Sequence, residues 1–193
     1  MGKRSDFTRL DKDFYRTIDP RAVEALLPFL NPETRFWEIC AGQGDLLNEL
    51  EKYSHTCTYA CDNNLELFEA NDMPSRIMFA NAFSICYDRS DLVDKYDCII
   101  SNPPWTRDIL HQLIEYITDK SKKPVWFLFD ADWAHTKQSA MLIHRYCTDI
   151  VSIGRLKWIP NTTMSGKDNC CWYCFNANKT QGDPPLFHGR KYE

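Results

Sequence analysis

The chain has 193 residues, of which 44% are apolar and 26% charged. This is enough for one globular domain with a sizeable core and too little for two full domains. Asp plus Glu (27) outnumber Lys plus Arg (23), and the net charge of -4 argues against a domain that holds nucleic acid by charge alone. No apolar run is long enough for a membrane span and the N-terminus is polar, so we expect a soluble, cytoplasmic protein with no membrane partner.

From residue 31 onward, short apolar β-rich runs alternate with amphipathic stretches, which predicts an α/β fold with a mostly parallel sheet. A leading helix is expected over residues 22–30. The expected strands cover residues 35–39, 56–61, 76–80, 96–101, 125–130, 151–158 and 170–176. The expected helices after the leading one cover residues 46–53, 65–70, 109–117 and 135–146. No helix separates the last two strands, so they should pair as an antiparallel hairpin at the end of a seven-stranded sheet.

No repeat or linker divides the chain. We expect a flexible N-terminus over residues 1–12, one folded domain over residues 13–176, and a tail over residues 177–193 that is mobile or docked by its apolar residues. Nine cysteines without an export signal predict reduced thiols. Cys170, Cys171 and Cys174 lack a second Cys or His pair at zinc spacing, so we expect buried thiols in a strand and no metal site.

The first chemically informative segment is a glycine turn after an expected strand. The strand ends in Glu38 and runs into Ala41-Gly42-Gln43-Gly44 before a helix. Glycines allow a tight turn and leave space for a ligand against the main chain, although an ordinary strand-to-helix turn has the same pattern. Asp62 closes the next strand, where an acid can bind both ribose hydroxyls. Together these features favour an adenosine-containing cofactor, either a dinucleotide or S-adenosylmethionine.

The segment Asn102-Pro103-Pro104-Trp105 favours S-adenosylmethionine over a dinucleotide. It follows the strand expected at 96–101, so Asn102 should lie at a carboxyl strand end beside the cofactor crevice. The two prolines fix the backbone, so that the Asn102 side chain and the Pro103 carbonyl form paired acceptors for an NH2 group. The nitrogen lone pair then points at a methyl donor, and Trp105 offers a flat surface for a base. The alternative is a rigid turn with a core tryptophan.

On these residues the sequence resembles the class I S-adenosylmethionine-dependent methyltransferases of the amino-group type, particularly small phage-like adenine-N6 DNA methyltransferases. The resemblance covers roughly residues 13–175 and rests on residues 13–17, 38–45 and 102–105, the last being the most specific. It implies a Rossmann-like methyltransferase domain over residues 13–176. It also implies direct in-line methyl transfer to the N6 amino group of adenine in DNA, without a covalent enzyme intermediate, after the base is flipped from the duplex.

The resemblance also assigns roles to individual residues. The implied catalytic residues are Asn102, Pro103, Pro104 and Trp105. The implied residues for S-adenosylmethionine are Tyr15, Thr17, Glu38, Ala41, Gly42, Gly44, Asp45, Asp62, Asn63, Asn81, Ala82 and Phe83. Tyr15 and Thr17 would touch the methionine end of the cofactor, and Asp62 would hold the ribose. Asn81 stands where the family usually has an Asp that contacts the cofactor adenine, which lowers the expected affinity for the cofactor.

Substrate recognition is less visible in the sequence. A chain of 193 residues leaves no room for a separate target-recognition region, so we expect a short or relaxed target and weak, local DNA contacts. Trp105 and Lys167 are the expected substrate-binding residues, the latter because the polar loop 161–169 joins the last two strands near the cleft. The other candidate contacts are basic clusters for which a solvated surface is the favoured interpretation, namely Lys120, Lys122 and Lys123; Arg155 and Lys157; and His188, Arg190 and Lys191. Trp133, Trp158 and Trp172 are expected in the core, the alternative being platforms for a base. Asp130 and Asp132 are expected as loop or capping residues, the alternative being that one of them faces the substrate pocket.

Two other functions share these motifs. A methyltransferase acting on adenine in RNA or on a glutamine side-chain amide in a protein also needs acceptors for a planar NH2 group. An inactive, cofactor-binding regulatory module is an alternative of another class, although the intact segment 102–105 speaks against it. The sequence does not indicate the target site, the oligomeric state or an accompanying restriction enzyme.

Overall fold

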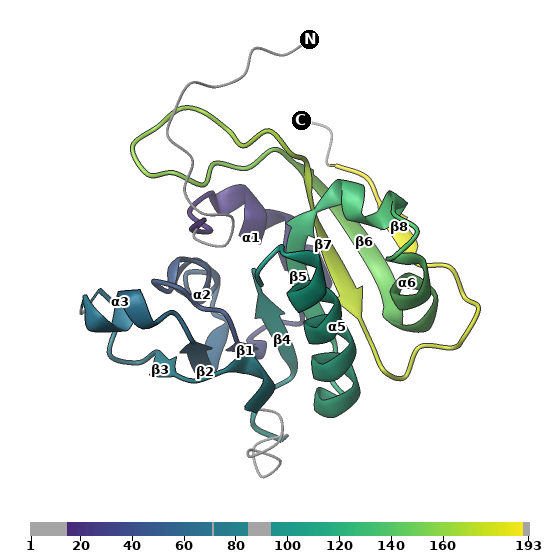
Figure 1. Cartoon of the computed structure of the whole chain (residues 1–193), viewed down its shortest axis with the longest axis horizontal. Coiled ribbons are helices and arrows are strands. Elements are labelled where there is room, and N and C mark those ends of the chain that lie inside the picture. Colours follow the sequence, from purple (N-terminus) through teal and green to yellow (C-terminus); the bar gives the residue numbers. More distant parts are fainter. Residues whose placement is uncertain (1–14, 71, 85–93, 191–193) are drawn as a thin grey trace.

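A computed structural model describes residues 15–70, 72–84 and 94–190 (Figure 1). The expected flexible residues 1–12 lie outside these ranges, as do Asp13, Phe14 and Lys191. Among the described residues, no helix is both long and apolar enough to cross a membrane.

The expected α/β fold is confirmed. The strands are β1 (Arg35–Glu38), β2 (Thr56–Asp62), β3 (Met78–Phe79), β4 (Cys98–Ser101), β5 (Val125–Asp130), β6 (Cys147–Gly154), β7 (Cys170–Phe175) and β8 (Leu186–His188). They form one sheet in the order β3-β2-β1-β4-β5-β7-β6-β8 (Figure 1). Strands β1 to β5 pair in parallel, whereas β7 lies antiparallel between β5 and β6. The predicted antiparallel hairpin is therefore present.

Helices cover both faces of this sheet. They are α1 (Pro20–Leu26), α2 (Asp45–Glu51), α3 (Leu65–Glu69), α5 (Arg107–Ser121) and α6 (Ala140–Tyr146), with 3-10 turns η1 (Leu27–Phe29) and η3 (Ala131–His135). One core packs α1 and α2 on the sheet, and a second packs α5, η3 and α6 on the opposite face. Because β5 lies between β4 and β7 under both layers, its first five residues are all buried, and the strand is apolar almost throughout.

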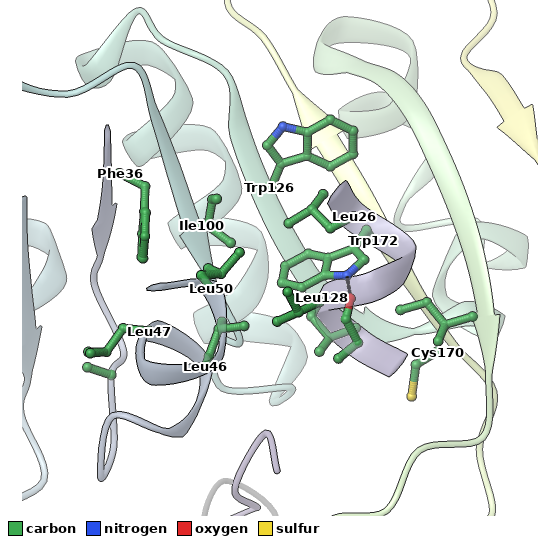
Figure 2. Packing of buried hydrophobic residues seen from close by; sticks show 14 of the residues in the cluster. Leu26, Phe36, Leu46, Leu47, Leu50, Ile100, Trp126, Leu128, Cys170 and Trp172 are labelled. Atoms are coloured by element: carbon green, nitrogen blue, oxygen red, sulfur yellow. Dashed lines mark hydrogen bonds between the residues drawn. The ribbon is translucent and has the colours of Figure 1, made fainter. Parts of the chain in front are cut away.

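The core below α1 is built around Trp172 of β7. Its indole is fully buried, and its Nε1 donates a hydrogen bond of 2.7 Å to the carbonyl of Ala22 (Figure 2). Leu26 of α1 and Leu128 of β5 belong to the same cluster. The hydrogen bond satisfies the polar atom of a large buried side chain, so α1 is held at a defined position beside the antiparallel hairpin. Trp172 is thus a core residue, as expected.

Within the described residues the sheet has eight strands rather than the expected seven. The additional strand, β8, comes from the tail and pairs in parallel with β6, with Leu186 opposite Asp149 and His188 opposite Val151. His188 Nε2 also lies 2.9 Å from an oxygen of the Asp149 carboxylate. A three-residue strand flanked by Gly and Pro has too little periodicity to be recognised from sequence. Leu186 and Phe187 remain largely exposed, so main-chain pairing rather than apolar burial docks this segment.

Three other elements differ from expectation. The strand expected at 151–158 runs from Cys147 to Gly154, where a positive φ of 92° ends the extended run. The helix expected at 135–146 is divided into η3 and α6, because the hydroxyls of Thr136 and Ser139 bond nearby backbone groups instead of continuing a helix. The strand expected at 76–80 contributes only the two-residue edge strand β3.

The cysteine cluster lies where it was expected. Cys170, Cys171 and Cys174 are free, buried thiols on β7. Burial raises the pKa of all three above the usual thiol range, so they stay protonated at neutral pH.

Candidate active site

A cleft of about 1450 Å³ opens at the carboxyl ends of β1, β2, β4 and β5. The strand order reverses between β1 and β4, and open α/β sheets bind ligands at such a switch point. The cleft brings together most of the residues predicted from sequence. Those that line it are Tyr15, Thr17, Glu38, Ala41, Gly42, Asp45, Asp62, Asn63, Asn102, Pro103, Pro104, Trp105 and Lys167.

Four predicted residues do not line the cleft. Gly44 is the N-cap residue of α2, with a φ of 82°, and a Cβ there would lie 3.2 Å from Ile77. Asn81 Oδ1 accepts a hydrogen bond of 2.9 Å from the backbone N–H of Phe83, so this side chain closes its own local turn. Ala82, between them, is buried. The cofactor contacts predicted for these four residues therefore have no counterpart in the cleft wall and stay predictions.

The glycine turn and Asp62 are joined directly. The backbone N–H of Gly42 donates to Asp62 Oδ2 and that of Asn64 donates to Oδ1, each over 2.8 Å. Gly42 has a φ of 50°, and no atom lies within 4 Å of the position that a Cβ would take. The carboxylate is thus fixed at the end of β2 beside open space, and each of its oxygens keeps a lone pair for a further donor, such as a ribose hydroxyl.

Glu38 is a buried acid at the end of β1 with one unpartnered oxygen, while the backbone N–H of Leu47 donates to its carboxyl. Its side chain is 1% exposed, and within the described residues Oε2 has no hydrogen-bond partner. Burial, and then the negative charges of Asp62 and Asp45, raise the pKa of Glu38 well above its usual range. An unpaired buried acceptor is costly, and a ligand that brings a donor or a positive charge relieves that cost. The α-ammonium group and the sulfonium of S-adenosylmethionine both suit this wall.

Arg16 is a cleft residue that the sequence did not reveal. Its guanidinium forms two hydrogen bonds with the Asp45 carboxylate, of 2.6 and 2.7 Å. Asp45, predicted to touch the cofactor, is therefore already engaged by an ion pair. The pair is partly exposed, and such pairs contribute up to about 1 kcal/mol. Its effect is to tie the segment that carries Tyr15 and Thr17 to the start of α2.

The side chain of Asn102 is held at both ends. Its Nδ2 donates to Thr17 Oγ1 over 3.0 Å and to the carbonyl of Tyr15 over 3.5 Å, while Oδ1 accepts from Trp105 Nε1 over 3.0 Å. An indole N–H can only donate, so the carboxamide oxygen must face Trp105. Pro103 and Pro104 restrict the backbone that follows. Asn102 therefore presents a carboxamide in one orientation within the cleft.

Trp105 packs against a second tryptophan at the edge of the cleft. Its ring meets Trp158 edge to face, with centroids 5.6 Å apart. Trp158 was expected in the core, and it is 8% exposed while also lining the cleft. Gly166 lies against the Trp158 indole, and a Cβ at Gly166 would be 2.8 Å from Trp158 Nε1. The backbone N–H of Gly166 donates to the carbonyl of Leu156 over 2.7 Å. These contacts hold the loop 159–169, with Lys167, at the cleft.

Asp130 also lines the cleft, at the end of β5. Its Oδ1 accepts a hydrogen bond of 2.9 Å from the backbone N–H of Asp132, which confirms the expected capping role. Burial raises the pKa of Asp130, the N–H of Asp132 lowers it, and the carboxylates of Asp132 and Asp168 raise it further. The net effect is that the pKa of Asp130 is raised.

Neither a family model nor a curated protein matches the sequence. Solved structures do match the fold. A Listeria monocytogenes protein, provisionally described as a class I S-adenosylmethionine-dependent methyltransferase, is 14% identical with a TM-score of 0.61, covering 94% of this chain and 68% of its own. The type I restriction-modification methyltransferase subunit of Streptococcus thermophilus is 11% identical with a TM-score of 0.57, covering 86% of this chain and 46% of its own. A dimethyladenosine transferase of Plasmodium falciparum is 12% identical with a TM-score of 0.52, covering 82% of this chain and 62% of its own. The chain therefore has the Rossmann-like fold of class I methyltransferases.

Proposed function

We propose that this protein transfers the methyl group of S-adenosylmethionine to the N6 amino group of adenine in DNA. The observation that carries the proposal is the Asn102 carboxamide, held by Thr17 and Trp105 in a cleft that also contains the glycine turn and Asp62. The fold shared with the Listeria protein supports the reaction class, and the Streptococcus restriction-modification subunit supports DNA as substrate.

The cofactor fits the wall formed by β1 and β2. S-adenosylmethionine, when bound, supplies a methyl group on a positively charged sulfur. In this proposal Asp62 accepts hydrogen bonds from the ribose hydroxyls, and the open space at Gly42 admits the cofactor against the main chain. Glu38 contributes the acceptor Oε2 at the cationic end, because that oxygen has no hydrogen-bond partner among the described residues. The acidic character of this wall thus matches a ligand that carries positive charge.

Asn102 and Pro103 would position the target amine. The second lone pair of Asn102 Oδ1 and the carbonyl of Pro103 each accept one N–H of the amino group, so that its nitrogen lone pair points at the methyl carbon. Trp105 stacks on the base. S-adenosylmethionine, when bound, would supply the electrophilic methyl carbon and keep the electron pair of the broken carbon–sulfur bond on sulfur. Asn102 and Pro103 would leave the lone pair of the amine free for the new bond, and the methylated amine would lose its proton to water. No nucleophilic side chain is required.

Adenine in RNA is the second candidate. The fold is shared with the Plasmodium dimethyladenosine transferase, and the Asn102 carboxamide can hold the same amino group in either nucleic acid. DNA and RNA differ in the ribose 2′-hydroxyl and in helix shape, but not in the adenine amino group that Asn102 would hold. A competition assay between the two nucleic acids is therefore needed to distinguish them.

The deciding experiment measures transfer of a tritiated methyl group to DNA, RNA and a protein lysate in parallel. We expect label in DNA, recovered after nuclease digestion as N6-methyldeoxyadenosine. Asn102→Ala should lower transfer by at least about 100-fold, while calorimetry shows a cofactor affinity within about threefold of wild type. Label only in protein, or an Asn102→Ala enzyme with near-normal turnover, would overturn the proposal. Cofactor binding without transfer to any of the three would identify the protein as an inactive module instead.

A further inference from the structure

A second depression borders the catalytic cleft and is rich in positive charge. It has a volume of about 860 Å³ and is lined by residues 18–21, 155, 157, 163, 165, 169 and 190. We call it the basic groove. Among these lining residues, Arg21, Arg155, Lys157 and Arg190 are cationic and Asp19 is the only acid. Because the chain carries a net charge of -4, this excess is a local feature and not a reflection of composition.

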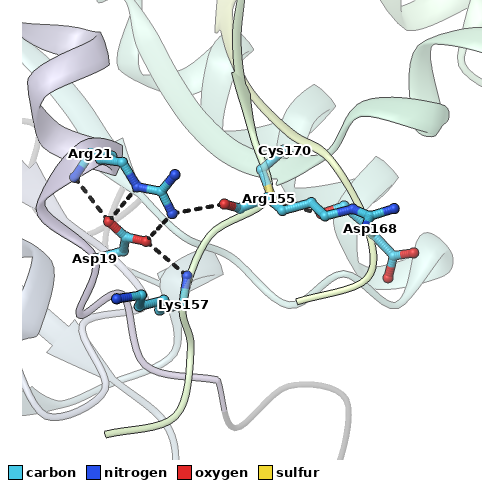
Figure 3. A network of polar contacts seen from close by, with 6 residues as sticks. All are labelled: Asp19, Arg21, Arg155, Lys157, Asp168 and Cys170. Atoms are coloured by element: carbon cyan, nitrogen blue, oxygen red, sulfur yellow. Dashed lines mark hydrogen bonds and ion pairs between the residues drawn. The ribbon is translucent and has the colours of Figure 1, made fainter. Parts of the chain in front are cut away.

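The charge of Arg21 is cancelled within the groove. Its guanidinium donates to the Asp19 carboxylate over 3.0 and 2.6 Å (Figure 3). Burial alone would raise the pKa of Asp19, but the hydrogen bonds from Arg21 and from the backbone N–H of Lys157 outweigh burial and lower the pKa. Asp19 is therefore ionised at neutral pH and neutralises Arg21. The uncompensated charges are those of Arg155, Lys157 and Arg190.

The same ion pair holds the backbone that carries two of these charges. Arg21 Nη2 donates to the carbonyl of Arg155, and the N–H of Lys157 donates to Asp19, each over 2.9 Å (Figure 3). The segment after β6 is thus fastened to the start of α1 through its main chain. Its two basic side chains are left exposed above a fixed backbone. A preformed arrangement of this kind lowers the entropy that a ligand must overcome.

Arg190 reaches the groove from the segment after β8. Its Nη1 lies 3.2 Å from the position that a Cβ would take at Gly154, so the missing side chain at the end of β6 makes room for it. Asp168 lies on the adjoining loop near Arg155 (Figure 3). Nevertheless, in the described part of the chain no carboxylate lies within ion-pair distance of Arg155, Lys157 or Arg190.

The groove has the chemistry of a phosphate-binding surface. Three unpaired cations stand beside the neutral donors Thr163, Ser165 and Asn169, the side-chain types that contact phosphate oxygens. Its position is equally specific. Ser165 lines both the groove and the catalytic cleft, and the chain passes from the cleft wall at Thr17 to the groove wall at Ile18. A strand with one nucleotide in the cleft would therefore carry neighbouring phosphates toward the groove.

We propose that Arg155, Lys157 and Arg190 bind the phosphodiester backbone of the substrate strand beside the target nucleotide. The inference rests on the proposed function for what occupies the cleft. Phosphate contacts give affinity that is independent of sequence and falls with salt, by about 0.7 in log K per log salt for each phosphate on a single strand. Three contacts thus contribute about 2 to the slope.

The test measures binding by fluorescence anisotropy in the full chain carrying Asn102→Ala, without cofactor. The probes are single-stranded DNA, duplex DNA and single-stranded RNA of about 12 nucleotides, in about 50 to 200 mM NaCl. The variant R155Q/K157Q/R190Q should lower the slope of log K against log salt by about 2. The matched control K120Q/K122Q/K123Q removes the same charge near the end of α5 and should leave the slope unchanged. Asp168→Asn should tighten binding severalfold.

The outcomes separate this inference from the proposed function. Equal slopes for the two triple variants would overturn the basic groove as a phosphate site, even if the protein methylates DNA. A selective loss in R155Q/K157Q/R190Q would support it, even if no methyl transfer is found. If an oligoglutamate peptide binds the groove and none of the nucleic acids does, the partner is an acidic protein and the inference is wrong. Unfolding temperatures of both triple variants should match wild type, because all six side chains lie at the surface and none of them forms an ion pair within the described residues.

Discussion

Trp105 Nε1 donates a hydrogen bond of 3.0 Å to Oδ1 of Asn102. The two residues are three positions apart, and Pro103 and Pro104 between them leave the backbone few alternatives. The bond orients the oxygen proposed to accept the target amine, and it uses one of that oxygen's two lone pairs. Trp105 thus acts on Asn102 through its N–H as well as offering a ring for stacking.

The two roles of Trp105 can be separated by substitution. Trp105→Phe keeps an aromatic ring but removes the N–H, so Asn102 loses one constraint worth about 0.5–1.5 kcal/mol. We expect kcat to fall roughly 3- to 10-fold with unchanged cofactor affinity. Trp105→Ala also removes the stacking surface, which should raise KM for DNA and lower kcat much further. Steady-state kinetics on one oligonucleotide measures both. Equal effects of Phe and Ala would argue against a separate role for the N–H.

Thr17 holds the opposite end of the same carboxamide. Thr17→Val preserves the shape of the side chain and removes the acceptor of Asn102 Nδ2, leaving a partly buried donor with only the longer bond to Tyr15. We expect kcat to fall about 3- to 10-fold. Thr17→Ser retains the hydroxyl and should restore turnover to near wild type. Since Thr17 lines the cleft, cofactor affinity is measured alongside. A loss confined to cofactor affinity would mean that Thr17 contacts the cofactor and does not position Asn102.

The position of the cleft could be predicted from sequence because it depends on short, local patterns. Glu38, Asp62 and Asn102 each follow or end an apolar strand, and parallel strands end at the same edge of a sheet. Their meeting in one cleft follows from this rule. The partners of Asn102 could not be predicted in the same way. Thr17 is 85 residues away in sequence, and its contact depends on where an irregular segment crosses the end of β4.

The basic groove also depends on contacts between distant parts of the chain, which the sequence does not show. Its charges come from three separate parts of the chain, around Arg21, Arg155 and Arg190. The last two belong to basic clusters that the sequence shows, but nothing in the sequence shows that the three parts meet. They meet because α1 packs beside the hairpin and β8 pairs with β6. A three-residue strand and a helix cap leave no periodic signal, so tertiary packing alone decides this arrangement.

Glu38 predicts a pH dependence of stability. Burial, and then the charge of Asp62, raise the pKa of this carboxyl in the folded protein, so the folded state keeps a proton that the unfolded chain has lost. Where the folded state binds more protons, the free energy of unfolding falls as pH rises, from about pH 4.3 up to the raised pKa. Glu38→Gln removes this titration. As pH increases from about 5 to about 8, the unfolding temperature of Glu38→Gln should therefore rise relative to that of wild type.

Thermal unfolding followed by circular dichroism at several pH values measures this effect. Each kcal/mol corresponds to about 2–4 °C for a domain of this size. Glu24→Gln, at an exposed position on α1, is the matched control and should track wild type. A temperature difference between Glu38→Gln and wild type that stays constant across the pH range would show that Glu38 does not titrate in this window.

The lack of space at Gly166 indicates that the loop 159–169 must pack closely on Trp158 at the edge of the cleft. Gly166 has no positive φ, so a substitution there meets only a problem of space, with a Cβ 2.8 Å from Trp158 Nε1 and 2.9 Å from Cδ1. Trp158 is nearly buried and packs on Trp105, so it cannot move without disturbing the ring proposed to stack on the base. Gly166→Ala should cost about 1–3 kcal/mol of stability and raise KM for DNA.

Gly189→Ala is the control for this substitution, because no atom lies within 4 Å of its Cβ position and its backbone has no positive φ. It should leave both the unfolding temperature and the kinetics at wild-type values. The expected signature of Gly166→Ala is a change in intrinsic tryptophan fluorescence together with the raised KM, since Trp158 and Trp105 shift as a pair. If Gly166→Ala loses stability but keeps its KM, the loop supports the fold without shaping the substrate side of the cleft.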